Sequence, residues 1–423
     1  MPTDDATAHG ATSPPPRAGH TAALAGTLAG TMGLGPLPLF ALMALSPLVI
    51  PELELSRTAF GSVTTLAFGV GMLGSVLAGR LVDRVGARRV GLGLLGASSA
   101  AIAVIAGAQS FAWLVGAAVL CGVAQAASNP ATNVLLTTEA PPSLRGTLMG
   151  IKQSGVQMGQ FLAGATLPAL AVVVGWRVSA LAALVLVAAI LVLLVATAPP
   201  TTPASARPAA GRSAGTASPA SDPSSRRAGS PAWLLAYTFL VAVVIQAVNA
   251  YIPLYGFEDV GLSAAAAGSA VGVIGVIGVA ARIGVGWSSG RLASPETLLL
   301  AVAIAGSGAM LAVAASAVVG PALLWLGVAT YAATALSANV LVMTTLLTTV
   351  EQGRMGRASG VLQMALFGGF ATGPLAFGGL VDLTASYVLG WLVVAGLLAA
   401  AAVVAGIGRA RTRATSPGAT TSP

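Results

Sequence analysis

The sequence predicts an all-α membrane protein made of two bundles of six transmembrane helices. First, 56% of the 423 residues are hydrophobic, and the mean hydropathy is +0.89. Second, apolar stretches long enough to cross a bilayer follow one another along most of the chain. Third, one long polar stretch near the middle divides these apolar stretches into two sets. Soluble domains do not have this composition.

The apolar stretches predict six membrane spans on each side of the polar stretch. We place them at 21–50, 58–79, 90–107, 111–135, 147–173 and 178–197, and then at 232–254, 264–287, 297–317, 321–347, 358–381 and 385–408. The N-terminal bundle is therefore expected at 21–198 and the C-terminal bundle at 232–408. Residues 199–231 are rich in Pro, Ser, Thr and Ala and predict a flexible cytoplasmic linker. Residues 1–20 and 409–423 are expected to be cytoplasmic tails.

The basic residues predict the orientation in the membrane. The chain has 20 Lys+Arg against 12 Asp+Glu, a net charge of +8 that in a soluble protein would suggest nucleic acid. With the N-terminus inside, however, the outer loops contain only Arg57 and Arg177, and the other basic residues fall on the inner side. Positive charge near span ends favours the cytoplasmic side. We therefore expect a multi-pass protein of the cytoplasmic membrane with both termini inside, and no nucleic-acid partner.

The reactive residue types argue against enzymatic or metal chemistry. The one cysteine, Cys121, lies in an apolar stretch, and the two histidines, His9 and His20, lie in the N-terminal tail. None of the carboxylates lies in the middle of a predicted span. A general acid–base pair inside the membrane is therefore not available. We expect no enzymatic activity, no metal site and no cofactor.

The segment between the second and third spans carries a recognisable pattern. It reads Gly79-Arg80-Leu81-Val82-Asp83-Arg84-Val85-Gly86-Ala87-Arg88-Arg89, and we expect it to form a short turn. The pattern resembles the G-x-L-a-D-r-x-G-r-[RK] loop of the major facilitator superfamily, on which Gly79, Leu81, Asp83, Arg84, Gly86, Arg88 and Arg89 fall. The resemblance implies a secondary transporter whose two bundles rock about a central cavity, so that access alternates between the two sides.

The same resemblance implies a gating role for this loop. The candidate gating residues are Gly79, Asp83, Arg84, Gly86, Arg88 and Arg89, with Asp83 making a contact in one conformation only. The alternative is that Asp83 only balances the charge of the nearby arginines.

The two halves also resemble each other. One displacement along the chain places Gly61-Ser62 on Gly268-Ser269 and Arg84 on Arg291, whereas Asp83 falls on Gly290. Matches that occur in the same order after a single shift along the chain predict a duplicated six-helix unit. In transporters built this way, the substrate binds between the halves near the bilayer midplane. The second copy of the loop lacks the carboxylate.

Polar side chains within the spans are the candidate substrate ligands. In the family the first, fourth, seventh and tenth spans line the cavity. Gln125 and Asn129 lie four residues apart in the fourth span, and Gln246 and Asn249 lie three apart in the seventh. Either substrate binding or hydrogen bonding between helices explains such residues.

Two cationic side chains inside spans are stronger candidates for a functional role than the amides. Lys152 lies in the fifth span and Arg282 in the eighth, and no carboxylate stands three or four residues from Lys152. One interpretation is that both side chains extend to the membrane surface. The other is that they bind an anionic substrate, with Gln153 or Gln157 supplying hydrogen bonds near Lys152.

The leading functional hypothesis is a carrier of a small solute, with an anion as the favoured substrate. One alternative is an efflux carrier for drugs or hydrophobic metabolites. It is weakened because the G-x-x-x-G-P element of the family's drug antiporters is found at 369–374 in the eleventh span, whereas the fifth has Gln160 at the proline position. The other alternative is a membrane sensor that does not transport. We expect a monomer whose partners are a small-molecule substrate and the lipid bilayer.

Overall fold

The structure is a computed structural model that describes residues 18–198, 232–288, 294–350 and 355–415, and all regular elements in these ranges are helices. The predicted linker at 199–231 lies outside the described residues. The N-terminal bundle contains α1 (Ala18–Leu34), α2 (Leu37–Ala44), α3 (Ser46–Glu52), α4 (Arg57–Val85), α5 (Ala87–Ala106), α6 (Phe111–Glu139), the 3₁₀ helix η1 (Pro142–Leu144) and α7 (Arg145–Thr197). The C-terminal bundle contains α8 (Ala232–Glu258), α9 (Ala264–Ser288), α10 (Pro295–Val319), α11 (Pro321–Thr334), α12 (Ala338–Thr349), α13 (Met355–Thr384) and α14 (Tyr387–Thr415).

These helices account for the predicted spans. Ten helices of the described residues are long and apolar enough to cross a membrane, and α1 with α2, bent by 58°, makes an eleventh. The bend lies at Gly35 and Pro36, between the two helices, as expected where a proline removes a backbone hydrogen-bond donor. Helix α14 runs to Thr415, so the arginines predicted to begin a tail at 409 continue a helix instead.

The remaining span comes from α7, which is a helical hairpin. Its 53 residues would extend about 80 Å as one straight helix, far more than the bilayer core. Gly175 has φ 79° and ψ 157°, a conformation that glycine adopts without steric cost. After it the chain folds back, and the Ser179 hydroxyl donates a hydrogen bond to the Leu167 carbonyl at 2.6 Å. The fifth and sixth spans are therefore the two arms of α7.

The turn of α7 is tied to α3 by one carboxylate. Glu52 accepts hydrogen bonds from Arg177 and from the Trp176 indole, and the Arg177 guanidinium also lies 4.3 Å from the centre of the Trp176 ring. The hydrogen bonds from Arg177 and then Trp176 hold the pKa of Glu52 below its usual value. This cluster holds the end of the first span against the turn between the fifth and sixth spans, at one end of the N-terminal bundle.

The predicted turn at Gly79–Arg89 is wrong in extent. Helix α4 continues through Val85, Gly86 alone links it to α5 with φ 87°, and α5 begins at Ala87. Gly79, Asp83 and Arg84 thus lie in the last turns of α4, and Arg88 and Arg89 lie in the first turn of α5. Leucine, valine and arginine tolerate a helix well, so the one glycine with a positive φ suffices as the connection.

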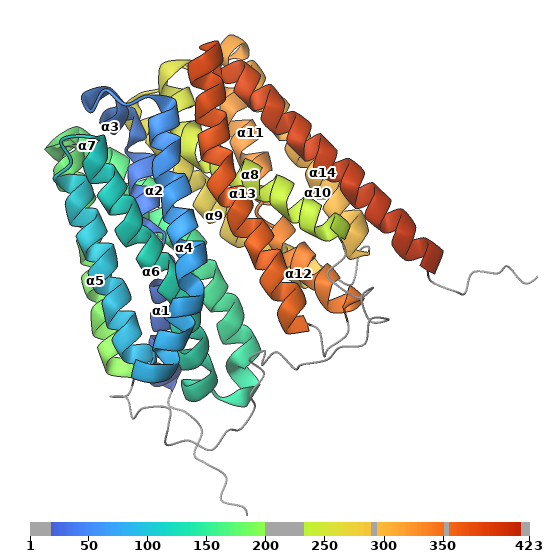
Figure 1. Cartoon of the computed structure of the whole chain (residues 1–423). Coiled ribbons are helices and arrows are strands. Elements are labelled where there is room, and N and C mark those ends of the chain that lie inside the picture. Colours follow the sequence, from blue (N-terminus) through green and yellow to red (C-terminus); the bar gives the residue numbers. More distant parts are fainter. Residues whose placement is uncertain (1–17, 199–231, 289–293, 351–354, 416–423) are drawn as a thin grey trace, which may run out of the picture.

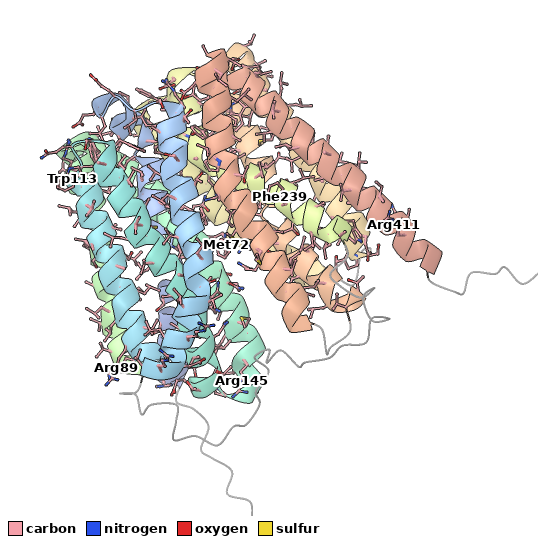
Figure 2. All side chains as sticks on the ribbon, viewed as in Figure 1. Met72, Arg89, Trp113, Arg145, Phe239 and Arg411 are labelled. Atoms are coloured by element: carbon pink, nitrogen blue, oxygen red, sulfur yellow. The ribbon has the colours of Figure 1, made fainter. Side chains whose placement is uncertain are left out.

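The two bundles meet mainly along two helix pairs, α4 with α13 and α7 with α9, and α2 and α3 add smaller contacts with α8 and α9. Figure 1 shows them close together near α3 and the start of α4 and separated at the opposite end. We call the first the Arg57 end, after the first residue of α4. We call the second the Arg89 end, where Arg89 and Arg145 are labelled in Figure 2.

Glycines permit the close approach of the bundles. A Cβ atom at Gly164 of α7 would lie 2.0 Å from the Gly272 nitrogen of α9. A Cβ atom at Gly61 of α4 would lie 2.4 Å from the Pro374 carbonyl oxygen of α13. Gly268, which the internal repeat pairs with Gly61, also faces the other bundle, where a Cβ atom would lie 2.2 Å from the Ala44 carbonyl oxygen and 2.7 Å from the Pro168 side chain. The repeat seen in the sequence is therefore also a repeat of the contact between bundles.

Candidate substrate-binding cavity

A cavity of about 450 Å³ lies between the bundles. The N-terminal bundle contributes α1, α2, α4, α6 and α7 to it, and the C-terminal bundle contributes α8, α9, α12 and α13. Its lining is rich in amide side chains: Gln125, Asn129, Asn133, Gln153, Gln157, Gln160, Gln246, Asn249, Asn339 and Gln363. Among the described residues of this lining the charged one is Arg282, and no Asp or Glu is present.

Lys152 lies directly behind this lining. Its side chain is 1% exposed, so the prediction that it extends to the membrane surface is wrong. The Lys152 Nζ donates hydrogen bonds to the Asn129 Oδ1 at 3.2 Å and to the Asn133 Oδ1. Gln153 and Gln157, which we expect to supply hydrogen bonds to a substrate near Lys152, both line the cavity, and the described partners of Lys152 are the two asparagines. The packing explains this burial, because α1 fills the space beside Gly155 and Gly159 on the same face of α7.

The bonds from Lys152 fix the direction of both asparagines. An ammonium group only donates hydrogen bonds, so each amide must turn its oxygen toward Lys152. The amide nitrogens of Asn129 and Asn133 are then left as donors for other partners. Because both asparagines line the cavity, this pair presents N–H groups to whatever occupies it.

Arg282 reaches from the C-terminal bundle to the N-terminal one. Its Nη1 donates to the Gln157 Oε1 at 2.7 Å and to the Gln153 carbonyl at 3.4 Å, and its Nε donates to the Leu336 carbonyl at 3.2 Å. The side chain is half-buried in the cavity wall, so extension to the membrane surface is wrong here too. With its oxygen taken by Arg282, Gln157 also has its N–H₂ group left to donate.

A chain of amides crosses between the bundles near these cations. The Gln160 Nε2 donates to the Asn249 Oδ1 at 3.1 Å, and the Asn249 Nδ2 donates to the Gln246 Oε1 at 3.0 Å. Gln246 and Asn249 are thus in the cavity lining, as are Gln125 and Asn129. The structure brings these four residues together with Gln153 and Arg282, and places Lys152 one layer behind.

Sequence reasoning missed Asn133 and gave Gln160 no role in binding. The signal for Asn133 was its place four residues after Asn129, which continues the polar face that begins at Gln125. Gln160 appeared only as a departure from a family pattern, because nothing in the sequence shows that it meets Asn249 across the interface.

Neither cation is neutralised by an ion pair. The ion pairs among the described residues are Arg57–Glu258 and Arg177–Glu52, and both lie away from the cavity. Transferring a cation out of water costs several kcal/mol, and a neutral amide offsets less of this than a carboxylate would. The cavity therefore combines positive charge with N–H donors, which is the environment that an anion requires.

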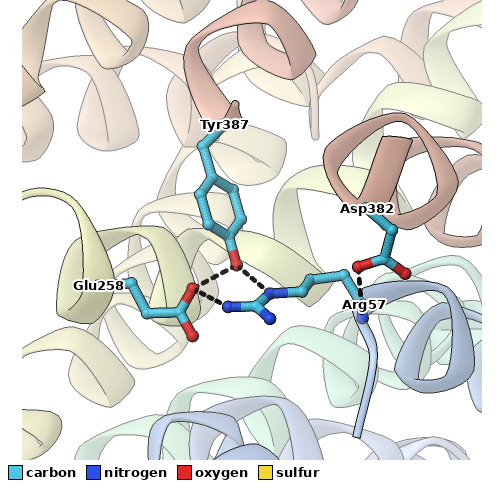
Figure 3. A network of polar contacts seen from close by, with 4 residues as sticks. All are labelled: Arg57, Glu258, Asp382 and Tyr387. Atoms are coloured by element: carbon cyan, nitrogen blue, oxygen red, sulfur yellow. Dashed lines mark hydrogen bonds and ion pairs between the residues drawn. The ribbon is translucent and has the colours of Figure 1, made fainter. Parts of the chain in front are cut away.

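A polar network closes the Arg57 end (Figure 3). Arg57 of the N-terminal bundle pairs with Glu258 at 2.7 Å and donates to the Tyr387 hydroxyl at 3.3 Å, and Tyr387 donates to Glu258 at 2.8 Å. Asp382 accepts from the backbone N–H groups of Arg57 and Thr58, at 3.1 and 2.8 Å, and from the Thr58 hydroxyl at 2.6 Å. A carboxylate from one bundle thus caps the first turn of a helix in the other. No pattern in the sequence predicts this network.

The candidate gating residues lie at the Arg89 end. Asp83 and Arg84 are exposed on the last turn of α4, and Arg89 is exposed on the first turn of α5. Within the part of the chain that the structure describes, Asp83 has no hydrogen bond or ion pair, so the state seen here does not contain the contact expected of it.

The chain is similar to known transporters in sequence, through a family model, and in fold, through solved structures. The family model described as Major Facilitator Superfamily matches residues 22–374. No curated protein sequence matches the chain. Among solved structures, a bacterial homologue of the human lysosomal transporter Spinster is similar with a TM-score of 0.72 at 16% identity, covering 94% of this chain and 98% of that one.

Two other transporter structures are also similar. The nucleoside transporter NupG has a TM-score of 0.70 at 13% identity, with 91% of this chain and 99% of that one covered. The human organic anion transporter MFSD10 (TETRAN) has a TM-score of 0.61 at 17% identity, with 91% and 98% covered. At these identities the likeness concerns the fold, whereas the family model covers most of the sequence. The chain belongs to the Major Facilitator Superfamily.

Proposed function

We propose that this transporter carries a small organic anion through the cavity between its bundles. The observation that carries the proposal is the pairing of Lys152 and Arg282 with amide oxygens in place of carboxylates. Intramembrane cations without a fixed counter-ion are costly, and they are functional candidates for that reason. An anion in the cavity would lower this cost, so binding and charge compensation occur together.

The donors around the cations support the same substrate charge. Lys152 leaves the amide nitrogens of Asn129 and Asn133 free to donate, and Arg282 does the same for Gln157. In this arrangement Lys152 is a positioning residue that acts through the two asparagines, whereas Arg282 touches the substrate itself. A cationic substrate would face donors and positive charge in the same place.

We propose alternating access as the mechanism. The Arg57 network holds one end closed in this structure. We propose that the Arg89 end faces the cytoplasm, because the arginines around Asp83 favour that side. Asp83, which has no hydrogen bond or ion pair to the described residues in this state, would then pair when the Arg89 end closes. Asp83→Asn is expected to slow transport and leave anion affinity largely intact. Loss of affinity and folding together would instead make Asp83 a structural residue.

Ligand-dependent thermal unfolding of the purified protein tests the substrate charge, because a ligand that binds only the folded state raises the melting temperature. The probes are a panel of monocarboxylates and their uncharged alcohols. We expect carboxylates to raise the melting temperature of the parent protein and to lose this effect in Lys152→Gln and Arg282→Gln. Lys152→Arg should keep part of it.

Arg177→Gln is the matched control, because it removes an arginine far from the cavity. Each variant must show cooperative unfolding without ligand, so that lost binding is not confused with lost folding. Parent-like responses to carboxylates in both Lys152→Gln and Arg282→Gln would overturn the anion site.

A further inference from the structure

We infer that the substrate is an amphipathic anion, with one anionic group and a flat apolar body such as an aryl ring. This inference rests on the proposed function and adds the part of the substrate that is not charged. It comes from the uneven distribution of residue types around the cavity, whose cationic side and aromatic side belong to different pairs of helices.

The aromatic side is a cluster of three phenylalanines. Phe68 of α4 packs against Phe367 and Phe370 of α13, with ring centres 6.1 and 5.1 Å apart, and the latter two rings are 6.3 Å apart. All three line the cavity. Phe68 is buried, whereas Phe367 and Phe370 are half-buried and so keep ring surface available. We call these residues the phenylalanine wall.

The cationic side lies on the other line of contact between the bundles. Arg282 belongs to α9 and its partner Gln157 belongs to α7. In the described residues α4 packs against α13, and α7 packs against α9, as separate pairs. Figure 1 shows α4 and α13 toward the viewer and α9 behind them. A ligand that contacts both sides must therefore be polar and anionic at one end and apolar at the other.

The size of the cavity and its other apolar residues suit such a ligand. About 450 Å³ lies within the range of pockets for organic molecules and exceeds the need of a small inorganic anion. Met32, Phe40, Ile245 and Leu366 add further apolar surface to the lining. An inorganic anion would leave this surface and the phenylalanine wall in contact with water. An aryl ring would cover it and stack against the exposed ring edges and faces.

Each side of the cavity is also shared between the bundles. Phe68 comes from the N-terminal bundle and Phe367 and Phe370 from the C-terminal one, just as Gln157 and Arg282 come from opposite bundles. An amphipathic anion would touch both bundles at both of its ends. Because such contacts form only when the bundles are correctly placed, both ends of the ligand contribute to recognition.

Calorimetric titration of the purified full-length protein with three matched probes tests the inference. The probes are 4-phenylbutyrate, butyrate, which lacks the ring, and 4-phenylbutanol, which lacks the charge. We expect 4-phenylbutyrate to bind at least about tenfold more tightly than either of the others, because burying an aryl ring and binding a charge each contribute more than about 1.4 kcal/mol.

Variants separate the two ends of the ligand. Phe370→Ala and Phe367→Leu should weaken 4-phenylbutyrate about tenfold and leave butyrate unchanged. The second variant keeps an apolar side chain and so covers the case in which the first fails to fold. Phe111→Ala, which removes an exposed ring at the start of α6, is the control and should leave all affinities unchanged.

The outcomes distinguish this inference from the proposed function. Equal affinity for butyrate and 4-phenylbutyrate, with no effect of the phenylalanine variants, would overturn the inference. The proposed function would still stand if Arg282→Gln abolished butyrate binding. Equal affinity for 4-phenylbutyrate and 4-phenylbutanol, unaffected by Arg282→Gln, would overturn both.

Discussion

The two asparagines next to Lys152 determine what that lysine presents to the cavity. Lys152 is 1% exposed and donates to the oxygens of Asn129 and Asn133. The charge therefore acts on a ligand partly by its field and partly through the two amide N–H₂ groups that it orients. A carboxylate at either asparagine position would cancel the charge and remove one donor group at once.

Asn133→Asp tests this arrangement. The new carboxylate would pair with Lys152, so anion affinity should fall by at least about tenfold, corresponding to more than about 1.4 kcal/mol of binding free energy. The melting temperature without ligand should stay the same or rise, because a buried cation gains a counter-ion. Asn133→Ala, which removes the donor but not the charge, should cost less affinity. Equal affinity of parent and Asn133→Asp protein in titrations with a monocarboxylate would contradict the role of Lys152.

Glycines decide how closely helices of opposite bundles can approach at the Arg57 end. On α7 and α9, Gly164 and Gly272 touch backbone to backbone, and there is no room for a methyl group between them. The same helix α7 has an open position at Gly150, where a Cβ would meet nothing within 4 Å. The requirement for glycine is therefore local to the contact between bundles.

Gly164→Ala should shift the protein away from the state closed at the Arg57 end. An added Cβ would lie 2.0 Å from the Gly272 nitrogen, so the helices must separate. The Thr65 hydroxyl of α4 donates a hydrogen bond to the Ala371 carbonyl of α13, across the bundles. Cysteines placed at these two positions, after Cys121 is replaced, report closure through the yield of cross-linking by a short thiol reagent. We expect Gly164→Ala to lower this yield severalfold and Gly150→Ala to leave it unchanged. An unchanged yield in Gly164→Ala would show that the contact is not needed for closure.

The Asp382 cap on α4 is a second element of closure. Asp382 accepts three hydrogen bonds from Arg57 and Thr58 of the other bundle. Glu258 makes one ion pair with a partly exposed arginine of that bundle, and its hydrogen bond from Tyr387 lies within its own bundle. Since solvent-exposed ion pairs contribute about 0–1 kcal/mol, Glu258→Gln should reduce closure at most about fivefold. Asp382→Ala should reduce it more. The same cross-linking assay measures both, and a larger effect of Glu258→Gln would show that the ion pair, and not the helix cap, dominates closure.

At the scale of elements, the sequence was more informative about spans than about connections. Hydropathy located each apolar stretch because span length is set by the bilayer. The connection at Gly86 was harder to predict, because an Arg-rich segment that looks like a turn also continues a helix without strain. The connection at Gly175 was predicted more closely, because the fifth span was expected to end at 173 and the sixth to begin at 178, on either side of the residue that breaks α7.

At the scale of the whole molecule, the fold followed from the sequence but the site followed only in part. The cations and several amides were recognisable as polar residues in apolar spans. Their partners were not, because Lys152 meets Asn133 on the preceding helix α6 and Arg282 meets Gln157 on a helix of the other bundle. Which side chains meet depends on the packing of whole helices. The Arg57 network is the extreme case, since Arg57 and Glu258 look like ordinary loop charges in the sequence.

The orientation of the molecule is testable in whole cells. The arginine distribution predicts that the linker is cytoplasmic and that the Arg57 end is outside. After replacement of Cys121, a single cysteine at Ser263, an exposed position just before α9, should react with an impermeant thiol reagent added outside. A single cysteine at Ser218 in the linker should react only after the cells are permeabilised. The reverse pattern would invert the assignment of the two ends.

The central claim is that an anion crosses the membrane through the cavity that contains Arg282, and transport by the purified protein tests it most directly. The measurement is uptake of radiolabelled 4-phenylbutyrate into proteoliposomes preloaded with the unlabelled compound, with protein-free liposomes as the baseline. We expect the parent and Arg177→Gln proteins to exchange the label well above this baseline. Uptake by Arg282→Gln protein should fall to the baseline, provided that the variant is reconstituted to the same level and unfolds cooperatively. Uptake by Arg282→Gln at the parent rate would contradict the account.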